Sequence, residues 1–194
     1  MNIGVSRAAV SLQEMVSQQV HLAVPMIALV SRSEAIRLLR EREPDNLIAV
    51  QQTFEGSIAG RALLIFPQTK SLELVRAITK SELSLEDIIE LEQEALAETG
   101  NIILNGCLAT IANLLKCSLR MTLPEILHGG GSDFFAMASL PTSEDVVMFL
   151  YIDFTVREHD IRGYICMLMD MPSLKILRGL IRNFLERTTD QAEF

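Results

Sequence analysis

Four polar residues in the middle of the chain, Glu94, Glu98, Asn101 and Asn105, follow one another at intervals of three and four. In a helix this spacing puts them in one stripe about 60° wide. The helix would therefore present a face of carboxylates and carboxamides, and a carboxamide can both donate and accept hydrogen bonds. The alternative is a solvated helix face without a functional role, which is the commoner origin of such a stripe.

The opposite side of the same helix is apolar and is expected to face a core, because Leu96, Ile103 and Cys107 recur at helical spacing. Ile102 and Leu108 flank the polar stripe. They are either exposed contacts for a partner or a second packed layer.

An Asn followed at a fixed interval by a Pro, here called the Asn-to-Pro frame, occurs twice in the chain. Asn2 precedes Pro25 by the same interval as Asn101 precedes Pro124, and the apolar positions within the two segments agree. One structural unit has therefore been used twice. Because Asn is a poor helix former and still recurs at the equivalent position, the repeat favours a role for the polar stripe.

The composition is that of a globular protein and predicts one domain. The chain has 194 residues, of which 49% are hydrophobic and 22% charged. We expect repeat one, about residues 1–82, and repeat two, about residues 83–194, to fuse into a single domain over 1–194. The net charge of -8 argues against a nucleic-acid partner, whose phosphates attract Lys and Arg.

Membrane insertion, secretion and a bound metal are not expected. The most apolar helix candidate, residues 102–115, is interrupted by Asn105 and Asn113, and the N-terminus lacks the pattern of a signal peptide. The three cysteines are odd in number and lie in apolar segments, which is typical of a reduced cytoplasmic protein. No spacing of Cys or His suggests zinc.

Periodicity and turn residues predict an α+β fold in which an antiparallel sheet is covered by helices. Each unit has the order helix, strands, helix. The expected helices are 6–16, 33–41, 71–79, 84–116 with a kink or a break near Gly100, and 173–187. The expected strands are 19–30, 47–54, 58–66, 119–127, 134–140, 146–154 and 161–169.

The segment Glu98-Thr99-Gly100-Asn101-Ile102, followed by Pro124, resembles the signature of the CheC/CheX/FliY family of chemotaxis phosphatases, and the chain is most like CheC. The family has Asp or Ser at the position of Glu94, which is a conservative departure. The first unit resembles the same signature through Asn2-Ile3-Gly4 and Pro25. Residues 54–67 are similar to the hairpin of CheC proteins, so the resemblance covers nearly the whole chain.

The two copies of the signature are unequal in this sequence. The family pattern puts a Glu three residues before the Asn, and no such residue precedes Asn2 in a sequence that begins at Met1. We therefore expect the Asn2 site to be incomplete unless the natural chain begins further upstream.

The resemblance implies hydrolysis of the aspartyl phosphate of CheY, the response regulator of two-component chemotaxis signalling. Asn101, and Asn2 in the first unit, would orient the attacking water by donating to one group and accepting from the water. Glu98 would meet a basic group of the partner, with Glu94 and Asn105 contacting it as well. Such phosphoryl transfer needs positioning rather than a nucleophile of the enzyme. The Mg²⁺ would be bound by CheY, and this chain needs no cofactor of its own.

An adaptor is the alternative function, because CheC proteins also bind the receptor deamidase CheD. The resemblance further implies a pseudo-twofold domain with one continuous antiparallel sheet, and we expect a monomer. The segment His128-Gly129-Gly130-Gly131 is similar to the oxyanion loop of lipases. Since the chain lacks the Gly-x-Ser-x-Gly of those enzymes, we interpret this segment as a turn between strands.

Overall fold

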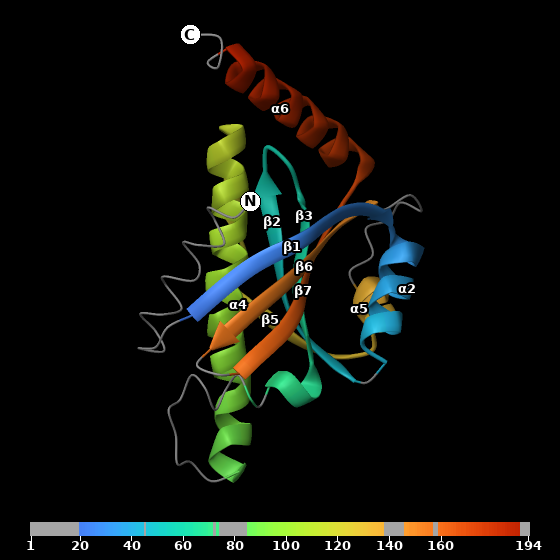
Figure 1. Ribbon diagram of the computed structural model, residues 1–194, viewed down its shortest axis with the longest axis vertical. Coiled ribbons are helices and arrows are strands. Elements are labelled where there is room, and N and C mark those ends of the chain that lie inside the picture. Colours follow the sequence, from blue (N-terminus) through green and yellow to red (C-terminus); the bar gives the residue numbers. More distant parts are fainter. Residues whose placement is uncertain are drawn as a thin grey trace.

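The computed structural model describes residues 20–44, 46–71, 73, 85–137, 146–156 and 159–190 (Figure 1). The predicted helix 6–16, the residue Asn2 and most of the predicted helix 71–79 lie outside the described residues.

One continuous antiparallel sheet forms the centre of the fold, in the order β1-β6-β7-β3-β2-β4, with β5 also paired to β2. The predicted α+β fold is thereby confirmed. Suppose that every strand of the first unit changes places with the corresponding strand of the second unit. The strand order is then unchanged when it is read from the opposite edge of the sheet. The duplication itself stays a prediction. The strands are β1 Val20–Ser31, β2 Leu47–Gly56, β3 Gly60–Pro67, β4 Leu119–Met121, β5 Glu125–Gly129, β6 Val146–Val156 and β7 His159–Met169.

Helices cover both faces of this sheet and create two separate cores. The helix α4, Leu85–Leu115, packs on one face together with residues of α6, Met171–Asp190. The helices α2, Arg32–Arg42, and α5, Gly131–Met137, pack on the other face (Figure 1). Because successive side chains of a strand point to opposite faces, β2 contributes to both cores. Ile48 and Val50 belong to the core under α4, and Leu47 and Ala49 to the core under α2 and α5.

Most predicted elements are confirmed within the described residues. The helices 33–41 and 173–187 correspond to α2 and α6, and five predicted strands correspond to β1, β2, β3, β6 and β7. Of the kink or break expected near Gly100, the break is wrong, because α4 continues through this residue as one helix. Gly100 is buried where α4 crosses β2.

Two strand predictions need correction. Residues 134–137 of the predicted strand 134–140 belong to helix α5, in which the neighbouring Phe134 and Phe135 are both buried in one core. A carboxylate oxygen of Asp133 accepts from the backbone N–H of Gly130 at 2.8 Å and caps the start of this helix. The predicted strand 119–127 is divided into β4 and β5 by residues 122–124. Pro124 has no N–H for a sheet hydrogen bond, which explains the interruption.

The apolar part of helix α4 is longer than residues 102–115. Leu91–Leu115 is long and apolar enough to cross a membrane by length and composition. Half of this segment is buried inside the fold, and Leu96, Ile103 and Leu104 are fully buried against the sheet. Its hydropathy is accounted for by its position as the core helix.

Candidate functional site

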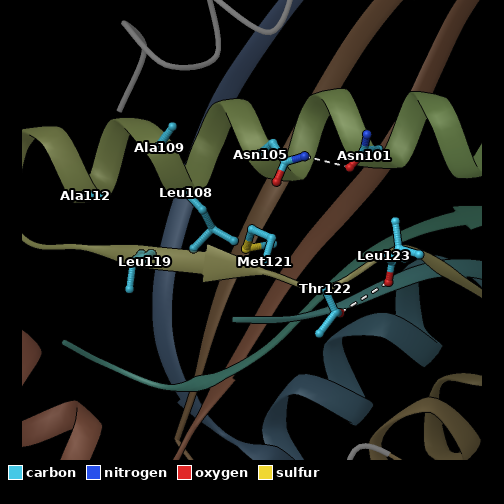
Figure 2. Close-up of a pocket in the computed structure, with 9 residues that line it drawn as sticks. All are labelled: Asn101, Asn105, Leu108, Ala109, Ala112, Leu119, Met121, Thr122 and Leu123. Carbon is cyan, nitrogen blue, oxygen red and sulfur yellow. Dashed lines mark hydrogen bonds between the residues drawn. The ribbon is translucent and has the colours of Figure 1, made fainter. Parts of the chain in front are cut away.

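The polar stripe of α4 borders a groove between this helix and the segment that follows it. The groove has a volume of about 460 Å³ and opens between α4 and β4 (Figure 2). Leu108 of α4 and Met121 of β4 face each other across it, and Asn101 lies toward its Leu123 end. Its lining residues are Asn101, Asn105, Leu108, Ala109, Ala112, Leu119, Met121, Thr122 and Leu123.

The carboxamide of Asn101 is held by two hydrogen bonds to its oxygen. Asn105 donates through Nδ2 to Asn101 Oδ1 at 2.6 Å, and Gln52 of β2 donates through Nε2 to the same oxygen at 3.0 Å. A carbonyl oxygen has two lone pairs, so both are engaged. Within the described part of the chain, Asn101 Nδ2 has no hydrogen-bond partner, and in Figure 2 it points away from Asn105. Asn101 therefore presents an N–H donor.

Gln52 connects Asn101 to the loop between β4 and β5. Its Nε2 also donates to the backbone carbonyl of Thr122 at 2.9 Å. That loop is tied to β2 by two further bonds, from Thr53 N to Thr122 Oγ1 at 3.0 Å and from Thr122 N to the carbonyl of Thr53 at 2.9 Å. One glutamine side chain thus joins Asn101 to Thr122, two residues before Pro124.

The two acidic residues of the stripe, Glu94 and Glu98, are exposed on the turns of α4 that precede Asn101. Neither forms an ion pair with another described residue. They are accessible to a partner that approaches the helix. Ile102 and Leu108 pack against the core, which settles the alternative left open for them in favour of a second packed layer.

Three residues of the site were missed by the sequence analysis: Gln52, Thr122 and Leu123. Gln52 could have been found, because Gln51 and Gln52 interrupt an otherwise apolar strand and both are buried. Leu123 is the most exposed large hydrophobic residue among those described, at 86%. It gives the mouth of the groove an apolar edge.

The cysteines are unsuited to nucleophilic chemistry. Burial raises the pKa of Cys107 to about 12, and burial raises the pKa of Cys166 further. Both thiols are therefore neutral near pH 7. No group of three or more His, Cys, Asp or Glu that could hold a metal ion occurs within the described residues. The side chains of the polar stripe are carboxamides and carboxylates.

The chain is similar in sequence to a bacterial CheC. It is 25% identical over 128 residues to the CheY-P phosphatase CheC of Bacillus subtilis (strain 168), and the match covers 64% of this chain and 61% of that protein. The chain thus matches less than two thirds of that CheC. No protein-family model matches the chain.

Solved structures share the fold at low identity. Thermotoga maritima FliY has a TM-score of 0.70 at 15% identity, covering 94% of this chain and 90% of that one. CheX in the CheX-CheY-BeF3-Mg²⁺ complex of Borrelia burgdorferi has a TM-score of 0.52 at 16% identity, covering 87% and 97%. The predicted resemblance to the CheC/CheX/FliY family is therefore confirmed, by sequence for CheC and by fold for FliY and CheX.

The same fold also occurs in the FliM middle domain from H. pylori. The TM-score is 0.55 at 10% identity, with 91% of each chain covered. Since one fold carries several functions, the activity has to be argued from the site.

Proposed function

We propose that this chain, similar in sequence to a CheC, is a cytoplasmic phosphatase that hydrolyses the aspartyl phosphate of a CheY-type response regulator. The observation that carries the proposal is the carboxamide of Asn101, fixed by Gln52 and Asn105 at the edge of a groove, with Glu98 exposed one turn earlier. Asn101 would orient the attacking water, and Glu98 would anchor the partner.

The chemistry needs little from this chain beyond positioning. The water oxygen forms a new bond to phosphorus, the bond between phosphorus and the aspartyl oxygen breaks, and the proton of the water passes to the phosphate or to solvent. The products are a free Asp carboxylate on the partner and inorganic phosphate. Phosphoryl transfer of this kind is catalysed by alignment and electrostatics. Mg²⁺, bound by the response regulator, would supply the charge that stabilises the phosphoryl oxygens.

The exposure of Glu98 supports the anchoring role that the family resemblance implies. An exposed carboxylate that has no ion-pair partner among the described residues can pair with a cation of another protein at little cost in stability. Glu94, one turn further from Asn101, would extend the same acidic contact. Asn105 lines the groove and bonds Asn101, so it would contribute to the arrangement of the water rather than to the anchor alone.

The test is the rate of phosphate release from a phosphorylated CheY-type receiver, measured with catalytic amounts of the chain and with the receiver alone. The proposal predicts many turnovers per chain and a rate proportional to its concentration. Release at the rate of the receiver alone, with and without added CheD, would refute it. Binding of CheD without phosphate release would instead identify the adaptor function.

A further inference from the structure

We infer that Gln52 is a positioning residue, which sets the orientation of the Asn101 carboxamide so that its N–H, and not its oxygen, faces the ligand. The kinetic part of this inference rests on the proposed function. The structural part does not, because it concerns the hydrogen bonds of the free chain.

One backbone carbonyl fixes the orientation of three carboxamides in series. The carbonyl oxygen of Thr122 can only accept, so Gln52 must present its nitrogen at this contact. The same Nε2 lies 3.0 Å from Asn101, and its second proton requires an acceptor there, which is Oδ1. The atom of Asn105 that lies 2.6 Å from this oxygen must then be its nitrogen. The Nδ2 of Asn101 is left on the opposite end of its own carboxamide.

The burial of Gln52 makes this orientation robust. The side chain is 1% exposed, and its Oε1 is buried without a partner among the described residues. A buried acceptor without a partner lowers the stability of the fold. The two hydrogen bonds donated by Nε2 offset this cost. The sequence explains the placement, because Gln52 lies on the face of β2 that carries Val50 and Phe54 toward α4.

The ligand group that meets Asn101 must therefore be a hydrogen-bond acceptor. If the ligand is the attacking water, one lone pair of its oxygen accepts the hydrogen bond from Asn101. The other lone pair of the water oxygen is directed at phosphorus. A phosphoryl oxygen would satisfy the same donor. In this arrangement Asn101 would donate to the water, whereas the role expected from the resemblance also has it accept a proton of the water; in the free chain both lone pairs of Oδ1 are engaged by Gln52 and Asn105.

The kinetic experiment compares Gln52→Leu with Gln51→Leu. Gln51 is the matched control, since it is buried in the same strand, also has a buried and unpartnered Oε1, and bonds Glu125 instead of Asn101. We expect Gln52→Leu to lower kcat for the phosphorylated receiver about 10-fold, the equivalent of one lost hydrogen bond, with KM changed less than about twofold. Gln51→Leu is expected to leave kcat unchanged. Equal effects of the two variants on kcat would overturn the inference.

A double variant shows whether Gln52 acts through Asn101. In the background of Asn101→Ala, the change Gln52→Leu is expected to cost no further rate, because the group that it positions is gone. Multiplying losses would mean that Gln52 acts by another route and would overturn the inference.

An NMR measurement separates this inference from the proposed function. The side-chain NH₂ signals of Asn101, assigned by their loss in Asn101→Asp, are expected to shift in Gln52→Leu and to stay in place in Gln51→Leu. Unshifted signals in Gln52→Leu would overturn the inference even for an active enzyme. Shifted signals in a chain without phosphatase activity would support it while refuting the proposed function.

Discussion

Gly100 lies directly against Val50, so that a Cβ atom built on this glycine would fall 2.4 Å from Cγ1 of Val50 and 2.6 Å from its Cβ. The contact sets the distance between α4 and β2, one residue before Asn101. Because Val50 is branched at Cβ, it cannot turn its side chain away from a methyl group at this point. The glycine is needed for close approach.

Gly100→Ala is therefore expected to destabilise the fold by about 1–3 kcal/mol, as overpacked cores do. Gly179→Ala in α6 is the control, because nothing lies within 4 Å of its added Cβ. Gly179→Ala is expected to raise the free energy of unfolding by up to about 1 kcal/mol, because Ala has a better helix propensity than Gly. Urea unfolding of both variants measures the difference. Two changes of the same sign would contradict this account of Gly100.

Leu123 is predicted to contact the response regulator without contributing to the fold. Because the side chain of Leu123 is 86% exposed, Leu123→Ser is expected to change the free energy of unfolding by less than about 0.5 kcal/mol. If the partner covers it, KM should rise by about 10-fold, the value of one buried aliphatic side chain. Leu185→Ser in α6, at a residue 57% exposed, is the control. An unchanged KM for Leu123→Ser would exclude this edge of the groove from the interface.

Glu98 is predicted to act in binding and not in the chemical step. Glu98→Gln is expected to raise KM roughly 10-fold, with a smaller salt dependence of kcat/KM and little change of kcat, because a charge pair across the interface is lost. Glu186→Gln on α6 provides an exposed acidic control. A fall in kcat at unchanged KM would assign Glu98 to the chemical step instead.

The buried thiols predict a loss of stability in alkali. Burial raises the pKa of Cys107 to about 12, whereas a thiol of the unfolded chain has a pKa of about 8.5. The unfolded state therefore loses its proton first, and stability is full below about pH 8.5 and falls as pH rises toward 12. The expected slope is about 1.4 kcal/mol per pH unit for each such thiol. Urea unfolding between pH 8 and 10.5 measures this slope. For Cys107→Ala the free energy of unfolding should fall less steeply with pH than for the wild type. Equal slopes for the wild type and this variant would contradict the assignment.

The sequence was informative for regular elements. The expected strands 146–154 and 161–169 and the expected helices 33–41 and 173–187 correspond to β6, β7, α2 and α6, and the polar stripe of α4 indicated the candidate site. The pair Phe134 and Phe135 misled the prediction, because strand propensity was overridden by an Asp133 cap and by burial of both rings in one core. Local propensity does not contain such tertiary contacts.

The partners of Asn101 could not be derived from spacing. Gln52 is far from Asn101 in the sequence and reaches it only because α4 crosses β2 at Gly100. That the two short strands on either side of residues 122–124 both pair with β2 was likewise not visible in the sequence. The Asn-to-Pro frame could be recognised from the sequence, but the hydrogen bonds of Asn101 to Gln52 and Asn105 required the fold.

The central claim is that Asn101 positions the water that releases phosphate. The most direct measurement is the rate of phosphate release from a phosphorylated CheY-type receiver with wild type, Asn101→Ala and Asn113→Ala, the last being an exposed asparagine of the same helix. We predict that Asn101→Ala loses about 100-fold to 1,000-fold in kcat, as for other single donors to a transition state, while Asn113→Ala retains the wild-type rate. Release by Asn101→Ala at the wild-type rate would contradict the account.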